Sequence, residues 1–297
     1  MRWQHDVFSN SVCFIDFNQP GTELYLESRL VMEHFDGGEL PARPLGQAIE
    51  TYPFTYPVEL VADLGSTHQR HYPDDGHILA WAQRFAAPGT DSLALLTAMT
   101  QAIRQEFTYN ARYEEGTQAP SQTLASQSGT CRDFALFMME AARALGFAAR
   151  FVTGYLYDPA VDSPGGLRGA GATHAWVQIF LPLSGWVEFD PTNGLVGGSN
   201  LIRVAVARDP AQAIPLSGSF QGLPGDFLGL EVDVQVRALT TSQQQPEPEP
   251  GPGPGTGPAE VVAPHPIAPA APTPQPSPAP KQTGEPGRQP EKAVARG

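Results

Sequence analysis

The sequence contains only two cysteines, Cys13 and Cys131, among its 297 residues. Two cysteines cannot build a disulfide framework or a multi-cysteine zinc site. Residues 1–6 carry no apolar run of the kind found in secretory leaders, and no segment of the chain is long and apolar enough to cross a bilayer. We therefore expect a cytoplasmic protein in a reducing compartment, with no membrane partner.

Basic residues are also scarce. The chain has 18 Lys and Arg against 31 Asp and Glu, which gives a net charge of −13. Proteins that bind nucleic acids use clustered Lys and Arg to neutralise the phosphates, so we expect no nucleic-acid partner. The acidity itself names no partner, because an acidic surface is more often a solubility feature. The oligomeric state stays open.

Aromatic residues are absent from the last part of the chain, since no Phe, Tyr or Trp follows Phe227. Proline-rich runs such as 246–250 and 270–274 bury too little apolar surface to offset the entropy lost on ordering. We expect residues 241–297 to form a disordered Pro-rich tail, locally extended as polyproline II. Residues 1–52 then form a partial β region with a connector, and residues 53–240 form one globular domain.

The pattern of apolar residues predicts a hairpin, then helices, then strands. The hairpin pairs residues 12–17 with 22–32 across the turn at 18–21, and residues 41–75 form an irregular connector. Because an isolated hairpin is marginally stable, we expect that it either packs on the rest of the chain or belongs to a sheet whose upstream part is missing. Helices first and an antiparallel sheet after them make an α+β domain. The predicted helices are 77–85, 91–107 and 131–146, and the predicted strands are 148–157, 173–181, 185–189, 202–207 and 230–238.

Cys131 opens the third predicted helix, directly after Ser128-Gly129-Thr130. The free N–H groups and the positive end of the helix dipole at such a position favour a thiolate, and the neighbouring Arg132 adds positive charge. A single cysteine in an apolar helix is more often a small buried hydrophobe. For Cys131 we instead expect a nucleophile, because an imidazole and a carboxylate follow downstream in the sequence.

His174 and Asp190 lie on predicted strands that a short turn at 182–185 joins into a hairpin. The symmetry of the sequence about that turn brings the two side chains within a few residues of each other across the ladder. A carboxylate there can hold the tautomer of the imidazole and stabilise its protonated form. A thiol, an imidazole and a carboxylate are the parts of a nucleophilic acyl-transfer site.

Four segments in this order resemble the bacterial transglutaminase-like family of the papain-like cysteine superfamily. The resemblance covers about residues 54–236, and it implies a papain-like core with the nucleophile at a helix N-terminus packed on an antiparallel sheet. In it, Cys131, His174 and Asp190 occupy the triad positions. The opening hairpin resembles the end of the family's N-terminal β-domain, whose earlier strands this chain is expected to lack. The segments are Gly129-Thr130-Cys131-Arg132-Asp133-Phe134-Ala135, Arg150-Phe151-Val152-Thr153-Gly154-Tyr155, Thr173-His174-Ala175-Trp176 and Trp186-Val187-Glu188-Phe189-Asp190-Pro191-Thr192.

The resemblance implies acyl transfer through a thioester on Cys131, from a peptide or protein substrate and without a cofactor. His174 would donate a proton to the leaving amine, and an amine or water would then release the acyl group. The protein would be a cysteine protease, an amidohydrolase or an acyltransferase. For the oxyanion, the backbone N–H of Cys131 is a candidate donor. The side chains of Gln118 and Gln122 are further candidates, and the sequence does not select between them.

Two other functions stay open. The same fold could act as a catalytically silent peptide-binding or scaffolding module, with the Pro-rich tail recruiting partners. A metallohydrolase would need a site built from His68, His71 and His77 with Asp74 and Asp75. That segment carries Pro73 and Gly76 and shows no regular spacing of ligands, so we expect a solvated loop and no metal.

Overall fold

The computed structural model describes residues 1–33, 50–111, 116–158, 173–198, 200–223 and 225–238, and the predicted tail at 241–297 lies outside them. Among the described residues, no helix is long and apolar enough to cross a membrane. The strands are β1 (Arg2–His5), β2 (Ser11–Phe14), β3 (Thr51–Tyr52), β4 (Thr90–Asp91), β5 (Thr108–Tyr109), β6 (Ser128–Gly129), β7 (Ala149–Leu156), β8 (Thr173–Leu181), β9 (Gly185–Asp190), β10 (Leu195–Val196) and β11 (Leu201–Ala207). The helices are α1 (Val58–Leu64), α2 (His77–Gln83), α3 (Ser92–Glu106), α4 (Pro120–Ser126) and α5 (Cys131–Ala144), with 3₁₀ turns η1 (Gly65–His68) and η2 (Pro210–Gln212).

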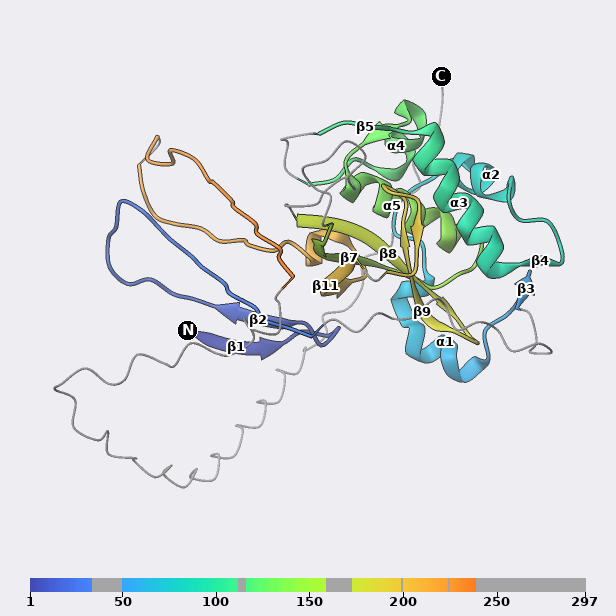
Figure 1. Ribbon diagram of the computed structural model, residues 1–297, viewed down its shortest axis with the longest axis horizontal. Coiled ribbons are helices and arrows are strands. Elements are labelled where there is room, and N and C mark those ends of the chain that lie inside the picture. Colours follow the sequence, from blue (N-terminus) through green and yellow to red (C-terminus); the bar gives the residue numbers. More distant parts are fainter. Residues whose placement is uncertain (34–49, 112–115, 159–172, 199, 224, 239–297) are drawn as a thin grey trace, which may run out of the picture. The chain divides into compact units, whose positions relative to one another are not determined.

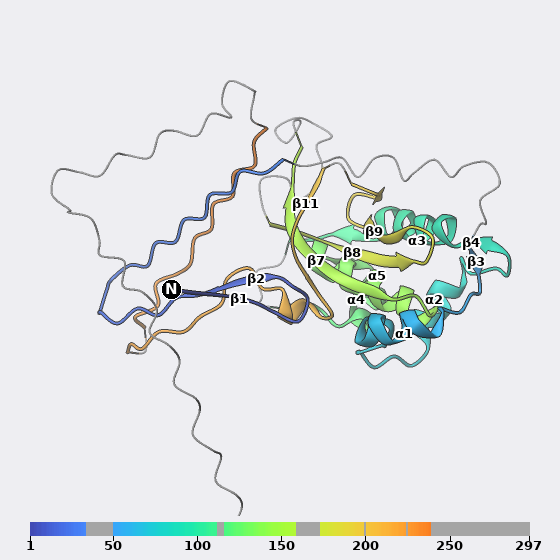
Figure 2. The ribbon, with the colours of Figure 1, turned by 90° about the horizontal axis from the view of Figure 1, so that it is seen from below.

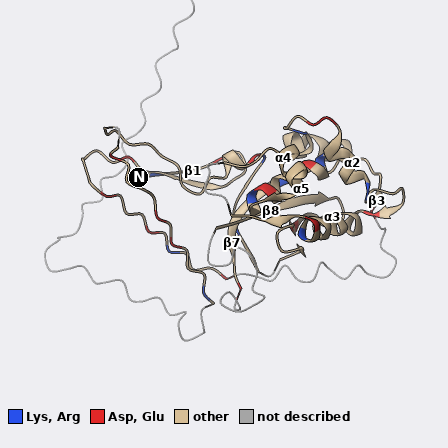
Figure 3. Cartoon of the chain, turned by 90° about the horizontal axis from the view of Figure 1, so that it is seen from above, with Lys and Arg blue, Asp and Glu red and all other residues tan. Residues whose placement is uncertain are grey.

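A five-stranded antiparallel sheet organises the fold, with the strands in the order β10-β9-β8-β7-β11. The middle strand, β8, has no Lys, Arg, Asp or Glu and is drawn in tan in Figure 3. Figures 1 and 2 show α5 lying along this sheet, and α5 packs against both β7 and β8. The predicted α+β class, with the cysteine at the start of a helix on an antiparallel sheet, is confirmed.

The helix α5 is the centre of the hydrophobic core. Of its 14 residues, 12 are buried, so apolar and polar side chains alike are enclosed. Helices that are covered all round lie in the interior of a fold. The chain leaves the helix through Gly146, whose φ of 92° is the left-handed conformation that glycine adopts without a steric penalty.

The helix α3 follows the prediction closely. Asp91 is its N-cap, and the Asp91 carboxylate accepts a hydrogen bond of 2.8 Å from the N–H of Ala94. One face of α3 is buried against α5 and the sheet, as the helical spacing of its apolar residues indicates. The buried apolar residues on this face are Leu95, Leu96, Met99, Ala102 and Ile103.

The predicted N-terminal hairpin is real, but its predicted position is wrong. β1 pairs with β2, whereas residues 15–33 contain no strand. The cause is Asp6, whose carboxylate accepts hydrogen bonds of 2.8 Å from the N–H groups of Phe8 and Asn10 and closes a turn there. Asn10 in turn exchanges two hydrogen bonds with the backbone of Val206, which ties the turn to β11. In residues 22–32, large apolar side chains such as Leu30 lie exposed, so no buried face stabilises a strand.

Three further predictions need correction. The stretch at 230–238 is not a strand, and its apolar residues, such as Leu230, are exposed. The connector predicted at 41–75 holds α1 and η1 in its described part. The short helix α4 was not predicted, although Pro120 at its first position is a recognised start signal.

Candidate active site

The nucleophile candidate Cys131 lies at the first position of α5 and is 8% exposed. The segment before it is fixed by a short parallel pairing of β6 with β5. In this pairing the N–H of Asn110 donates to the carbonyl of Gly129 at 2.9 Å. Because Thr130 is the N-cap, the free N–H groups of the first helical turn begin at the cysteine.

The buried carboxylate of Asp133 stabilises the start of α5 through hydrogen bonds. Its Oδ2 accepts hydrogen bonds from the backbone N–H of Thr130 at 2.8 Å and from the Thr130 hydroxyl at 2.9 Å. Its Oδ1 accepts a third from the backbone N–H of Gln118 at 2.7 Å. Burial alone would raise the pKa of the Asp133 carboxyl, but these hydrogen bonds outweigh it and hold the pKa below its usual range. The carboxylate therefore stays charged in a fully buried position.

Gly129 is required where it stands, because a Cβ there would lie 2.8 Å from the Cβ of Asp133. Sequence reasoning missed the role of Asp133. The signal was present, because Thr130-x-x-Asp133 has the spacing of a capping box, and the structure forms that box.

His174 and Asp190 are brought together by the pairing of β8 with β9, as the sequence predicts. The Nε2 atom of His174 lies 2.9 Å from Oδ2 of Asp190, and both side chains are completely buried. Asp190 ends β9, and its carboxylate also accepts hydrogen bonds from the N–H of Thr192 at 2.9 Å and from the side-chain amide of Asn193 at 2.8 Å. These bonds fix the carboxylate so that one oxygen faces the imidazole.

The Cys131 thiol also interacts with the imidazole of His174. Burial alone would lower the pKa of His174, but the charge and hydrogen bond of Asp190, followed by the interaction with Cys131, raise the pKa from 6.5 to about 10. Asp190 occupies Nε2, and Nδ1 is buried without a well-formed hydrogen bond. With Nε2 occupied by Asp190, Nδ1 is the ring nitrogen that remains open to the thiol. The three residues singled out from the sequence thus meet around one imidazole.

A comparison with protein families agrees with this geometry. Residues 79–191, which span all three residues, match the model of the transglutaminase-like superfamily. This match supports a transglutaminase-like family for the domain. The superfamily includes cysteine proteases and acyltransferases.

Curated relatives resemble part of the chain. Uncharacterized protein ML0607 of Mycobacterium leprae is 35% identical over 106 residues, which is 36% of this chain and 37% of the relative. Uncharacterized protein Rv2569c of Mycobacterium tuberculosis is 33% identical over 138 residues, 44% of this chain and 43% of the relative. The chain thus spans about two fifths of the length of these relatives. A solved structure, the periplasmic domain of TgpA from Pseudomonas aeruginosa, aligns at 27% identity with a TM-score of 0.34, over 43% of this chain and 46% of that one.

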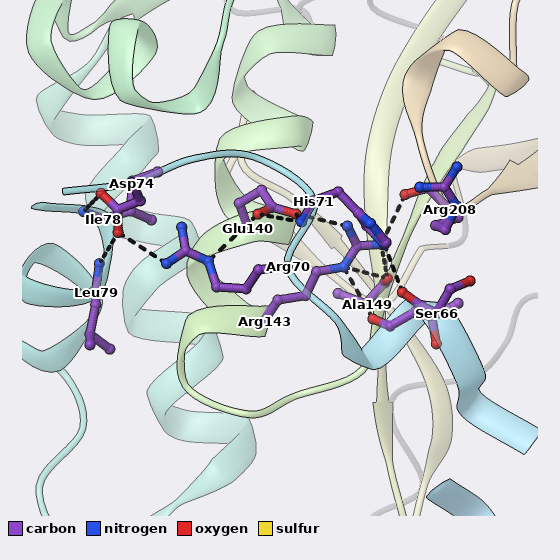
Figure 4. Close-up of polar contacts among 11 residues, drawn as sticks. Ser66, Arg70, His71, Asp74, Ile78, Leu79, Glu140, Arg143, Ala149 and Arg208 are labelled. Carbon is purple, nitrogen blue, oxygen red and sulfur yellow. Dashed lines mark hydrogen bonds and ion pairs between the residues drawn. The ribbon is translucent and has the colours of Figure 1, made fainter. Parts of the chain in front are cut away.

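The C-terminal half of α5 in this transglutaminase-like domain is anchored by a buried ion pair (Figure 4). Arg143 donates to Glu140 at 2.8 Å, and both side chains are fully buried. Arg70 lies 3.6 Å from the other oxygen of Glu140 and donates at 3.1 Å to Asp74. Arg143 also donates to backbone carbonyls of three separate segments, those of Thr67, Ala149 and Arg208. A buried ion pair needs such additional hydrogen bonds to offset its desolvation.

The two glutamines considered as oxyanion donors differ in their surroundings. The side-chain amide of Gln118 donates to the carbonyl of Ser128 at 3.1 Å and to Asp133 at 3.2 Å, so it holds the helix start. Gln122 lies exposed on α4.

The histidines considered for a metal have structural contacts instead. Nε2 of His68 lies 2.9 Å from the carbonyl of Gly146, and Nε2 of His71 lies 2.8 Å from the carbonyl of Ser66. His77 begins α2. Within the described part of the chain, no three His, Cys, Asp or Glu side chains gather as a metal site.

Proposed function

We propose that this protein is a cysteine enzyme that cleaves or transfers the acyl group of a peptide or carboxamide bond. The supporting observation is the buried His174–Asp190 pair with the Cys131 thiol acting on the same ring, at the first turn of a helix. A histidine whose pKa lies above neutrality is protonated at physiological pH. The adjacent thiol can then give up its proton and act as a thiolate.

In the proposed reaction the thiolate of Cys131 attacks the carbonyl carbon of the substrate. The carbon–nitrogen bond breaks, and the His174 imidazolium gives its proton to the departing amine, which leaves a thioester on Cys131. Asp190 keeps the ring oriented and stabilises its charged form. Water or a second amine then attacks the thioester and loses a proton to His174, and the acid or new amide is released with a free thiol. The N–H of Cys131 is the proposed donor to the oxyanion.

We propose a peptide or protein as the substrate and the cytoplasm as the location. Both cysteines are free, and a nucleophilic thiol works only in its reduced form.

The test compares the two cysteines of the chain as an internal control. Cys13 lies on β2 of the N-terminal hairpin, where it is partly buried and is not at the start of a helix. With iodoacetamide at about pH 7, we expect Cys131 to be alkylated roughly tenfold or more faster than Cys13, and His174→Ala to abolish that difference. Equal rates in the parent protein would overturn the activated nucleophile and favour the peptide-binding module.

A second experiment tests the covalent step. A library of peptides and carboxamides is incubated with the parent protein and quenched in acid, and the mass added to Cys131 is read by mass spectrometry. We expect an acyl adduct on Cys131 and none in Cys131→Ala. Turnover of the same substrate by Cys131→Ala at the parent rate would reject the thioester mechanism.

A further inference from the structure

The imidazole of His174 has a flat neighbour that the proposed mechanism does not use. The indole of Trp176 lies against it, with ring centroids 5.9 Å apart and an angle of 26° between the planes. Trp176 is completely buried and belongs to a small apolar cluster with Val152, Leu156, Leu201 and Val206. The indole therefore forms a rigid wall on one side of the imidazole.

A glycine in β7 makes the room for this wall. Gly154 pairs with His174 across the ladder between β7 and β8. A Cβ on Gly154 would lie 2.8 Å from Cη2 of Trp176 and 2.1 Å from the carbonyl oxygen of Ile202. Glycine inside a strand costs stability, and here it permits the close approach of the indole and of β11.

Glu188 on β9 fixes the polar end of the same indole. One carboxylate oxygen of Glu188 accepts the indole N–H of Trp176, and the other accepts a side-chain hydrogen bond from Gln178. Gln178 in turn accepts a hydrogen bond of 2.7 Å from Nε of Arg150. Burial raises the pKa of the Glu188 carboxyl, whereas these two hydrogen bonds and the charges of Arg203 and Arg150 favour its ionised form. Since both carboxylate oxygens accept, the network needs no proton on Glu188.

The hydrogen bond to Asp190 still allows the imidazole of His174 one rotation. A ring held through Nε2 alone can still turn about the line that joins Nε2 to Oδ2. Such a turn would move Nδ1 away from the thiol. A flat, buried indole at a small angle to the ring opposes this rotation.

We propose that Glu188 is a positioning residue for His174, and that it acts through the indole of Trp176 to keep Nδ1 directed at Cys131. The inference rests on the proposed function, because it assigns Glu188 and Trp176 a role in the proposed active site. Glu188 touches neither the thiol nor the imidazole, and its effect has to pass through one hydrogen bond, that from the indole N–H.

Two substitutions act on that hydrogen bond from opposite ends. Glu188→Gln keeps the shape of the side chain and replaces the charged acceptor of the indole N–H by a neutral amide, which is a weaker acceptor. Trp176→Phe keeps an aromatic ring beside His174 and removes the N–H. The matched control is Arg150→Met, which removes a charge from the far end of the same network and leaves the indole contact intact.

The first measurement is the rate at which iodoacetamide alkylates Cys131 between about pH 6 and pH 9. We expect Glu188→Gln to lower this rate roughly five- to tenfold near neutral pH, and Arg150→Met to leave it close to the parent rate. In the Trp176→Phe background, Glu188→Gln should have no further effect, because the contact through which it acts is already gone. Equal slowing by Arg150→Met, or additive losses in the double variant, would overturn the inference and make the effect one of stability.

The second measurement does not depend on reactivity. The ring protons of His174 feel the ring current of the indole, so their NMR shifts report how the two rings lie. We expect Glu188→Gln to move these resonances and Arg150→Met to leave them in place. If Cys131 of the parent protein reacts no faster than Cys13, the proposed function fails. The inference about ring placement fails separately, when the His174 shifts are unchanged in Glu188→Gln.

Discussion

Replacing Asp133 by alanine should destabilise the protein far more than the loss of an ordinary helix cap. Two backbone N–H groups, those of Thr130 and Gln118, would lose an acceptor at 2.8 and 2.7 Å. A hydrogen bond to a charged group contributes about 1.5–3 kcal/mol, and the cap itself about 1 kcal/mol. The carboxylate no longer has to be desolvated, which offsets part of the loss. We expect Asp133→Ala to lower the free energy of unfolding by about 3–5 kcal/mol.

Asp91 supplies the matched control for this substitution. It caps α3 through a hydrogen bond to the N–H of Ala94, and it is only partly buried. Asp91→Ala should cost about 1 kcal/mol. Urea unfolding of the parent and both variants at about pH 7, followed by tryptophan fluorescence, gives the two differences directly. A cost for Asp133→Ala no larger than that for Asp91→Ala would refute the reasoning.

The pH dependence of the free energy of unfolding tests the same contacts of Asp133 a second time. The pKa of Asp133 is lower in the folded protein than its usual value of 3.8. Its stabilisation is therefore fully present above the unfolded pKa and is lost as the pH falls through the folded pKa. Asp133→Asn removes this charge, so the deficit against the parent should be largest near neutral pH and shrink below about pH 4. A deficit that stays constant on acidification would contradict the charge assignment.

Two further predictions concern the other buried charges. The pKa of His174 is raised from 6.5 to about 10, so its stabilisation is complete below pH 6.5 and is lost as the pH rises through 10. Asp190→Asn should remove that alkaline loss, and equal slopes of unfolding free energy between pH 6.5 and 10 would contradict it. Glu140→Ala removes the carboxylate to which the buried Arg143 donates and should cost about 3–5 kcal/mol. Glu106→Ala breaks only the exposed pair with Arg84 and should cost less than about 1 kcal/mol, so comparable melting temperatures for the two variants would contradict the assignment.

The predictions that were confirmed rest on local signals. Asp91 marks the start of α3, and Gly146 marks the end of α5. The turn at 182–185 joins β8 to β9 as the alternation of apolar residues indicates. These signals work because each depends on a few neighbouring residues whose backbone conformation is restricted by their chemistry.

The predictions that failed depend on distant contacts. Residues 22–32 and 230–238 have the alternation of strands, but in the structure their large apolar side chains are exposed. Alternation shows that a segment can form a strand, and only a partner surface makes it one. The true hairpin instead depends on Asp6 and on the tie between Asn10 and Val206, which lie 196 residues apart. The packing of α1 in the supposed connector likewise depends on its contacts with the rest of the domain.

The order of Cys131, His174 and Asp190 could be read from the chain itself, together with the helix start that presents the thiol and the turn that brings the imidazole to the carboxylate. Tertiary packing was needed to establish which ring nitrogen of His174 contacts Asp190 and how far the pKa of His174 rises, because both depend on burial and on charges from separate elements. The same packing places Asp133 and the pair of Trp176 and Glu188 around these residues. Sequence periodicity assigns a side chain to a face of a strand or helix, whereas the packing of that face sets the distances on which the chemistry depends.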